Sequence, residues 1–374
     1  MKKDLLMWDE TLFRDIEVFE TDYIPEQFNF RDTQIRELAL NVRPGMKGAR
    51  PLNTICRGLP GTGKTTSIKK LFEQIEEKTK KLIPVYVNCQ IDNTKFAIFS
   101  QIYKKLTNRP PPASGTSFKN LFDQVCKLVS ERDAVLLVCL DDANYLLYEK
   151  EINKVLYTLL RSHEANEGVR IGIITVISDM SVDLMQEVDQ RVSSIFRPSE
   201  IYFPPYDETE ISNILNERIM QGLYPGVLSN NMLELVVEQT MKSGDLRVGI
   251  DLLKRSALNA EMDARKEVGK DDICRAYMVS KYIHLSHTVK TLSEEEKKLL
   301  KAVAEMSLAE KEMTAGSVFE EIKKVADTGY TRYYEIIKKF DSMRLINLNY
   351  REGKGRTRVI TLRYDPARII AILP

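Results

Sequence analysis

The sequence predicts an α/β fold built on a parallel sheet, followed by an all-helical lid domain and a C-terminal winged helix-turn-helix. Strand patterns alternate with helix patterns over residues 52–203, which favours parallel βαβ units. Only helical patterns follow from Tyr206 to about 283, and the tail then shows three helix patterns and a hairpin. We therefore expect three domains, at residues 1–205, 206–285 and 286–374.

The composition is that of a globular chain without an overall charge bias. The chain has 374 residues, which exceeds one ordinary core, and is 43% hydrophobic and 29% charged. Its net charge of +1 gives no general attraction for polyanions, so a nucleic-acid surface would need local charge segregation. The five cysteines have no C-x-x-C spacing and suit a reduced core. With neither a signal peptide nor a membrane-spanning run, we expect a cytoplasmic protein with no membrane partner.

The central motif is residues 58–65, Gly-Leu-Pro-Gly-Thr-Gly-Lys-Thr, which matches the phosphate-loop pattern G-x-x-x-x-G-K-[ST]. A short apolar strand precedes it, and a helix with one apolar face follows. Glycines let backbone N–H groups surround a polyphosphate at the positive end of the helix. We expect ATP or ADP here, with Lys64 on the β- and γ-phosphates and the Thr65 hydroxyl on Mg²⁺. The expected clamp consists of Pro60, Gly61, Thr62, Gly63, Lys64, Thr65 and Thr66.

Carboxylates end the most hydrophobic strand pattern, residues 134–142. The carboxyl ends of parallel strands lie at the edge of the sheet that carries the phosphate loop. Asp141 is therefore predicted to orient Mg²⁺, directly or through water, and Asp142 to polarise the attacking water. The alternative is a solvated Asp-Asp turn. Another strand, residues 170–177, ends in Ser178-Asp179, where a polar side chain can sense the γ-phosphate.

The remaining elements follow from periodicity and from turn residues. Helices are expected at about 31–42, 94–106, 117–131 and 149–164, and strands at 82–88 and 201–203. Residues 43–51 and 108–115 are expected to be loops, because both are rich in Pro and Gly. Residues 23–31 are either an ordinary connector or a segment that covers the adenine base.

The tail carries the local excess of positive charge. Residues 328–374 contain ten Lys/Arg and four Asp/Glu, a balance of +6. The third tail helix, about 330–343, is the expected recognition helix, and residues 351–357 form a basic, Gly-rich hairpin tip. This pattern favours duplex DNA over a protein-binding winged helix. The expected contacts are Arg332, Lys338, Lys339, Lys354, Arg356 and Arg358.

The order of these motifs resembles the archaeal replication initiators of the origin-recognition family, which are AAA+ P-loop ATPases related to the eukaryotic origin-recognition and licensing ATPases. The resemblance covers about 20–374 and includes the Tyr23-Ile24-Pro25-Glu26 segment and the Gly244-Asp245-Leu246-Arg247 motif. It implies an adenine-side group of Tyr23, Ile24, Pro25, Arg31 and Tyr206. It also implies a lid sensor at Arg247, an arginine finger at Arg191 and a DNA-contacting insertion around 94–120.

Two departures from the family pattern concern hydrolysis. The family usually has Asp-Glu at the end of the acidic strand, whereas this chain has Asp141-Asp142. The family's first sensor is usually Asn, and Ser178 takes that place here. Both changes imply a weak Mg-dependent ATPase.

The resemblance implies a nucleoid-associated, ATP-dependent replication initiator. It would bind double-stranded origin DNA, help to recruit the replicative helicase and use its ATP or ADP state as a switch. Other initiator paralogues are further expected partners. Two alternatives remain open: a transcription regulator whose ATPase gates a winged helix, and a remodelling ATPase similar to clamp loaders or transposition helpers.

Overall fold

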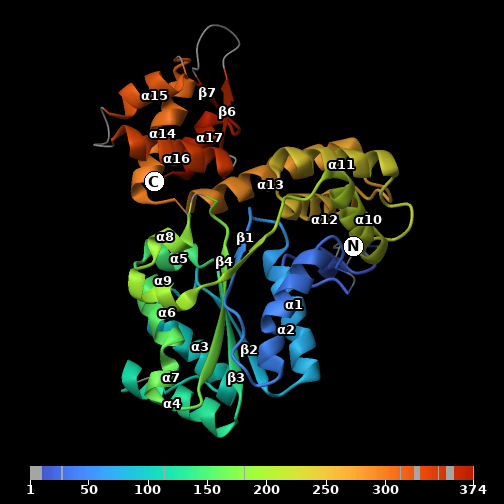
Figure 1. Cartoon of the computed structure of the whole chain (residues 1–374). Coiled ribbons are helices and arrows are strands. Elements are labelled where there is room, and N and C mark those ends of the chain that lie inside the picture. The colour runs from blue at the N-terminus through green and yellow to red at the C-terminus, as the bar shows by residue number, and fades with distance from the viewer. Residues whose placement is uncertain are drawn as a thin grey trace. The chain divides into compact units, whose positions relative to one another are not determined.

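The computed structural model describes residues 11–26, 28–112, 115–180, 182–290, 292–311, 313–323, 329–343, 345–350 and 358–373 (Figure 1). The chain forms two compact units. Residues 26–205 make up one unit, and the N-terminal segment up to Pro25 belongs with residues 206–374 in the other. The expected first domain began at residue 1, so the N-terminal segment is placed differently here.

The unit of residues 26–205 is built on a parallel sheet with the strand order β2-β3-β4-β1-β5. The strands are β1 (Thr54–Arg57), β2 (Leu82–Asn88), β3 (Val135–Asp141), β4 (Arg170–Ile177) and β5 (Ser199–Tyr202). Because every pairing is parallel, the carboxyl ends of the strands meet at one edge. The end of β3 lies between the ends of β2 and β4, and the register pairs Asn88 with Asp141.

The sheet is covered on both faces, as an all-parallel sheet requires. The helices α1 (Asp32–Met46) and α2 (Lys64–Lys78) pack on one face; α3 (Lys95–Thr107), α4 (Phe118–Glu131) and α6 (Ile152–Leu160) pack on the other (Figure 1). Alternate residues of β3 enter different cores: Leu136 and Val138 join the α3 side, and Leu137 and Cys139 join the α2 side. The uninterrupted apolar run of β3 is explained by this double burial.

Most expected elements of this unit are present, with two differences. α1 continues through Pro44 to Met46, although residues 43–51 were expected to be a loop. Pro44 has no N–H, so it cannot donate the usual helical hydrogen bond to the carbonyl of Leu40, four residues earlier. The single helix expected at 149–164 is divided into α6 and α7 (Ser162–Ala165), and α5 (Asn144–Tyr148) precedes them. The short helices α8 (Leu184–Glu187) and α9 (Gln190–Phe196) lie before β5.

The second unit begins with the lid helices. These are α10 (Glu208–Gly222), α11 (Asn230–Ser243), α12 (Leu246–Met262) and α13 (Lys270–Lys290), joined by the 3₁₀ helix η1 (Ile16–Phe19). Backbone hydrogen bonds from Arg14 and Asp15 to the Gly222 carbonyl attach the N-terminal segment to the lid, and Arg218 Nη1 donates to the Val18 carbonyl. The segment is therefore part of the lid.

The C-terminal winged helix follows from the far end of α13, whose Leu285 and Val289 enter its core. Its elements are α14 (Glu294–Leu308), α15 (Ala315–Ile322), α16 (Tyr330–Ser342), β6 (Ile346–Tyr350), β7 (Arg358–Leu362) and α17 (Pro366–Ile372). Ser293 and Glu296 form the capping box at the start of α14, and β6 pairs antiparallel with β7. The predicted hairpin is confirmed, whereas α17 was not predicted. The hairpin tip, residues 351–357, lies outside the described residues.

Candidate functional site

The loop between β1 and α2 has a shape that only glycine permits at several positions. Gly61 and Gly63 have φ angles of 74° and 84°, in the left-handed region that L side chains rarely adopt. A Cβ atom on Gly58 would lie 2.4 Å from the Phe203 carbonyl oxygen. The curled loop, which includes Pro60, leads into the first turn of α2, where Thr66 lies. This is the backbone geometry that binds phosphate groups at a helix N-terminus.

Lys64 places its ammonium group inside this loop. Its Nζ donates hydrogen bonds to the carbonyl oxygens of Gly58 and Leu59, at 2.8 and 2.7 Å. Thr62 Oγ1 also donates to the Leu59 carbonyl, at 2.8 Å, which tightens the loop. Lys64 is only 5% exposed. A cation that is held by neutral carbonyl groups in a buried loop is well suited to an incoming polyphosphate.

Asp141, at the end of β3, joins the acidic strand to the phosphate loop. Its Oδ2 accepts hydrogen bonds from Thr65 Oγ1 and from the Tyr86 hydroxyl, both at 2.7 Å. Its Oδ1 accepts the Asp142 backbone N–H at 3.0 Å, and the residue is 4% exposed. The structure therefore brings together the two residues that were expected to serve Mg²⁺. Hydroxyl and carboxylate oxygens are the hard ligands that Mg²⁺ prefers, so these residues fit the ion.

Tyr86 was not identified from the sequence. It lies on β2 and faces Cys139 in the strand register. Burial, and then the neighbouring Asp141 carboxylate, raise the pKa of Tyr86 well above its ordinary value. The phenol therefore stays protonated and acts as a hydrogen-bond donor at neutral pH. Only the strand order could reveal this contact, because the residues are 55 positions apart.

Asp142 and Ser178 also lie together. Ser178 Oγ donates a hydrogen bond to Asp142 Oδ1 at 3.0 Å, across the adjacent ends of β3 and β4. Asp142 has a φ of 51°, a left-handed conformation that Asp adopts more readily than most residues. Beside this pair, the buried Asp179 accepts a hydrogen bond from the Tyr148 hydroxyl at 2.9 Å. The candidate water-polarising acid is thus held by the residue expected at the sensor position.

Arg31 is fully buried against the phosphate loop. Its Nε donates to the Thr62 carbonyl at 2.9 Å, and its Nη groups donate to the carbonyls of Phe30 and Pro204 at 2.6 and 2.7 Å. Arg31 was expected beside the adenine. In the structure it braces the backbone of the phosphate loop, which is a supporting role that the sequence did not predict.

The other expected nucleotide-side residues belong to the second unit. Tyr23 donates to Gln221 Oε1 at 3.1 Å, and Ile24, Pro25 and the buried Tyr206 belong to the same unit. Arg247 forms an ion pair with the buried Asp245 carboxylate, at 2.6 Å. Their roles toward a nucleotide remain predictions.

Arg191, the expected arginine finger, is in the first turn of α9 with its side chain 78% exposed. It forms an ion pair with Asp189 at 3.0 Å, and this hydrogen bond is the main reason that the pKa of Asp189 is lowered. An exposed guanidinium with a weak surface partner can reach a neighbouring molecule at little cost.

The winged helix presents a small group of basic and aromatic side chains. Lys338 Nζ lies 4.5 Å from the centre of the Tyr334 ring, and both residues are on α16. Arg358, at the start of β7, donates from Nη1 to the Tyr334 hydroxyl at 2.7 Å. Tyr334 was not identified from the sequence, although its i, i+4 spacing to Lys338 is a usable signal.

Arg332 forms ion pairs with Glu295 and Glu335, at 3.3 and 3.4 Å. Lys354 and Arg356 lie outside the described residues.

The structure corrects the expectation that Lys339 contacts DNA. Lys339 is 7% exposed, and its Nζ donates to both carboxylate oxygens of Glu296, at 3.0 and 3.2 Å. Glu296 is 3% exposed and also accepts the Ser293 backbone N–H. This ion pair connects α14 to α16 inside the domain. The sequence could not show it, because the helical period places Lys339 beside the apolar face without indicating what lies opposite.

We expect Lys339→Met to loosen the winged helix, because it leaves the buried Glu296 charge without its partner. Removing one member of a buried ion pair typically costs about 3–5 kcal/mol. Amide hydrogen exchange of the full chain should show lost protection in α14 and α16. Adding Glu296→Gln should restore much of it, and the exposed Lys338→Ala is the matched control. Unchanged exchange in both helices would show that the pair is not structural.

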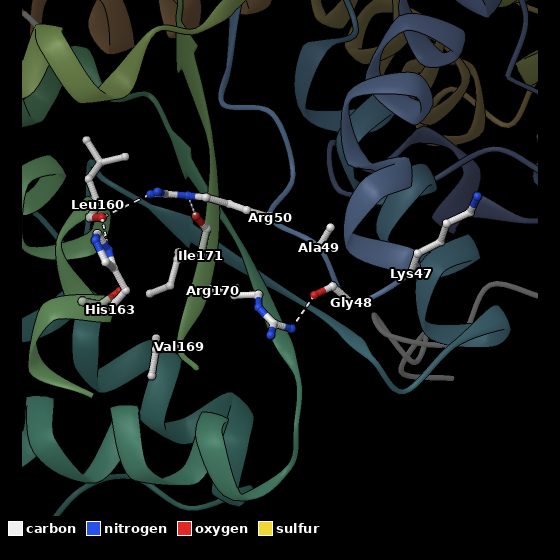
Figure 2. Close-up of a pocket in the computed structure, with 10 residues that line it drawn as sticks. Lys47, Gly48, Ala49, Arg50, Leu160, His163, Val169, Arg170 and Ile171 are labelled. Carbon is white, nitrogen blue, oxygen red and sulfur yellow. Dashed lines mark hydrogen bonds between the residues drawn. The ribbon is translucent and has the colours of Figure 1, made fainter. Parts of the chain in front are cut away.

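A surface pocket of about 590 Å³ lies at the amino ends of the strands, where β4 begins (Figure 2). This is the end of the sheet opposite to the phosphate loop. Arg50 donates from Nε to the Ile171 carbonyl at 2.8 Å and from Nη2 to the Leu160 carbonyl at 3.2 Å. Arg170 Nη1 donates to the Gly48 carbonyl at 2.6 Å. Leu160 is the last residue of α6, so the Arg50 cation lies at the negative end of a helix. These bonds fasten the loop after α1 to the sheet, which is a structural role.

Four of the five cysteines are buried, as expected, and Cys274 is exposed. Burial is the main cause that raises the pKa of Cys56, Cys89, Cys126 and Cys139, so their thiols stay protonated. In the parts of the chain that the structure describes, no three His, Cys, Asp or Glu side chains converge as a metal site. None of the helices there has both the length and the apolar character to cross a membrane.

The sequence matches three protein families along its length. Residues 49–181 match the AAA domain family, residues 212–278 match the Cdc6 AAA+ ATPase-type lid domain, and residues 287–371 match the CDC6 C-terminal winged helix domain. These matches and the structure confirm the predicted fold class.

Similar proteins include the ORC1-type DNA replication protein 3 of Haloarcula marismortui, which is 46% identical over 98% of this chain and 97% of its own length. The ORC1-type DNA replication protein 2 of Methanosarcina mazei is 43% identical over 99% of this chain and 98% of its own length. Among solved structures, the ORC2 protein of Aeropyrum pernix in ADPNP–ADP complexes is similar, with a TM-score of 0.74 and 25% identity. That match covers 97% of both chains. The Aeropyrum pernix ORC1 protein in complex with DNA shares the fold, with a TM-score of 0.70, 23% identity, and coverage of 98% of this chain and 97% of its own.

Proposed function

Because the chain belongs to the archaeal family of ORC1-type DNA replication proteins, we propose that it is an ATP-dependent, DNA-binding replication initiator. The observation that carries this proposal is the hydrogen bond between Thr65 and Asp141, which joins the phosphate loop to the acidic strand in a chain that ends in a winged helix. A nucleotide-responsive unit and a DNA-binding unit in one chain suit a switch at an origin.

The nucleotide is ATP or ADP with Mg²⁺. Lys64 supports this assignment, because its buried ammonium group lies among neutral carbonyls that a β- or γ-phosphate would replace as its partners. Thr65 and Asp141 would hold Mg²⁺, which would supply positive charge between the phosphates. The complexes of the Aeropyrum pernix ORC2 protein with ADPNP and ADP agree with this ligand class.

Hydrolysis would be slow. Asp142 is positioned by the Ser178 hydroxyl and would polarise a water molecule, but its side chain is one methylene shorter than a glutamate. The exposed Arg191 would complete the site of a neighbouring molecule, and Arg247 would report the nucleotide state from the lid. A slow hydrolysis step suits a switch, because each state then lasts long enough to be read by a partner.

The DNA partner is double-stranded origin DNA. Lys338, Arg358 and the Tyr334 ring that both of them contact would meet the duplex, together with Lys354 and Arg356 of the hairpin tip. The replicative helicase and other initiator paralogues are the further partners proposed. The ATP or ADP state would determine whether the helicase is recruited.

Footprinting on genomic DNA that contains an origin tests this function. We expect a protected site at the origin whose extent or strength differs between ATP and ADP. Protection at promoters instead would favour a transcription regulator. No protection of duplex DNA, combined with nucleotide-dependent binding to another protein, would favour a remodelling ATPase.

A further inference from the structure

Tyr86 connects β2 to the end of the acidic strand through its hydroxyl group. The hydroxyl donates to Asp141 Oδ2 at 2.7 Å, the same oxygen that accepts Thr65 Oγ1 at 2.7 Å. The Tyr86 ring is half-buried, and Lys69 Nζ of α2 lies 5.3 Å from its centre. The phenol is therefore fixed between α2 and β3.

The number of lone pairs on the Asp141 carboxylate limits what else it can bind. A carboxylate oxygen presents about two lone pairs, and Oδ2 already accepts two donors, from Thr65 and Tyr86. Oδ1 accepts one donor, the Asp142 backbone N–H at 3.0 Å. A cation could use Oδ2 only by displacing a hydroxyl group. The open position on this carboxylate is therefore on Oδ1.

We propose that Tyr86 is a positioning residue of the metal site, whose hydroxyl occupies Asp141 Oδ2 and so leaves Oδ1 as the carboxylate oxygen available to a cation. Asp141 would then act on the ion through Oδ1, directly or through water, and through the Thr65 hydroxyl. This inference rests on the proposed Mg-nucleotide site and deepens it, because it assigns the Asp141 oxygen that is left for the ion.

Removing the Tyr86 hydroxyl frees a lone pair and leaves the carboxylate charge less neutralised. Both changes favour direct contact with a cation. Ca²⁺ takes six to eight oxygen ligands in a flexible arrangement, whereas Mg²⁺ requires a tight octahedron and keeps several waters. The freed oxygen should therefore help Ca²⁺ more than Mg²⁺. Tyr86 would thus favour Mg²⁺ over Ca²⁺, while weakening the binding of both ions.

The test uses the full chain and a fluorescent ADP analogue, titrated with MgCl₂ and separately with CaCl₂. For Tyr86→Phe we expect the half-saturating Mg²⁺ concentration to fall by about threefold to tenfold, the range that one hydrogen bond allows. The half-saturating Ca²⁺ concentration should fall by a larger factor than that of Mg²⁺. Binding of the analogue without metal should match wild type. Tyr202→Phe, on β5 of the same sheet, is the matched control and should change neither midpoint.

The inference would be overturned if the half-saturating Mg²⁺ concentration of Tyr86→Phe were equal to or higher than that of wild type. An equal shift of this concentration in Tyr202→Phe would also overturn it. In an Asp141→Asn background, Tyr86→Phe should lose its effect, because the proposed action passes through the carboxylate. A persistent effect would also overturn it. If Tyr86→Phe loses metal-free binding, Tyr86→Leu provides a second variant without the hydroxyl. Failure of wild type to bind the analogue at any metal concentration would instead contradict the nucleotide site itself.

Discussion

Lys64→Ala is expected to remove nucleotide retention from this protein. The Lys64 ammonium is buried inside the phosphate loop and is the cation that would meet the β- and γ-phosphates. Hydrogen bonds to a charged group contribute about 1.5–3 kcal/mol each, so the affinity should fall by roughly a hundredfold. The measurement is the nucleotide content of the purified protein, followed by titration with a fluorescent ADP analogue.

Lys78→Ala is the matched control for this variant, because Lys78 is an exposed lysine in the last turn of the same helix. It should retain wild-type nucleotide content. A Lys64→Ala protein that is folded by circular dichroism and still copurifies with normal nucleotide content would contradict the assignment of the phosphate loop.

The double variant Lys338→Ala, Arg358→Ala is expected to weaken duplex DNA binding and to reduce its salt dependence. Both cations lie against the Tyr334 ring, on the recognition helix and the adjoining strand. Each lost phosphate contact should reduce the log–log salt slope by about 0.9, so the pair should reduce it by about 1.8. The measurement is fluorescence anisotropy on origin and scrambled duplexes at several salt concentrations.

The comparison of the two duplexes separates positioning from base reading. If the lost contacts are to phosphates, both duplexes should weaken alike and the sequence preference should survive. The control is the double variant Lys298→Ala, Arg368→Ala, which also removes one lysine and one arginine from exposed positions of the winged helix. It should leave the salt slope unchanged. Equal slopes for wild type and the Lys338, Arg358 variant would place the DNA surface elsewhere or favour a protein partner for this domain.

The features that the sequence determined by itself are those encoded over a few neighbouring residues. Gly61 and Gly63 supply positive φ angles at fixed spacing from Lys64, and an amphipathic helix follows directly. Ser293 and Glu296 define the start of α14 through hydrogen bonds within one helical turn. Such signals need no knowledge of distant contacts, which is why the phosphate loop, the five strands of the parallel sheet and the winged helix were predicted correctly.

The tertiary structure alone decided which distant residues became partners. Tyr86 reaches Asp141 only because β2 lies beside β3 in the sheet, and alternation along a strand does not specify the neighbouring strand. Arg and Lys are residue types that usually lie at the surface. In this structure Arg31 is buried against backbone carbonyl groups, and Lys339 is buried against Glu296. Burial of a charge depends on partners far away in the chain, and the local pattern does not contain that information.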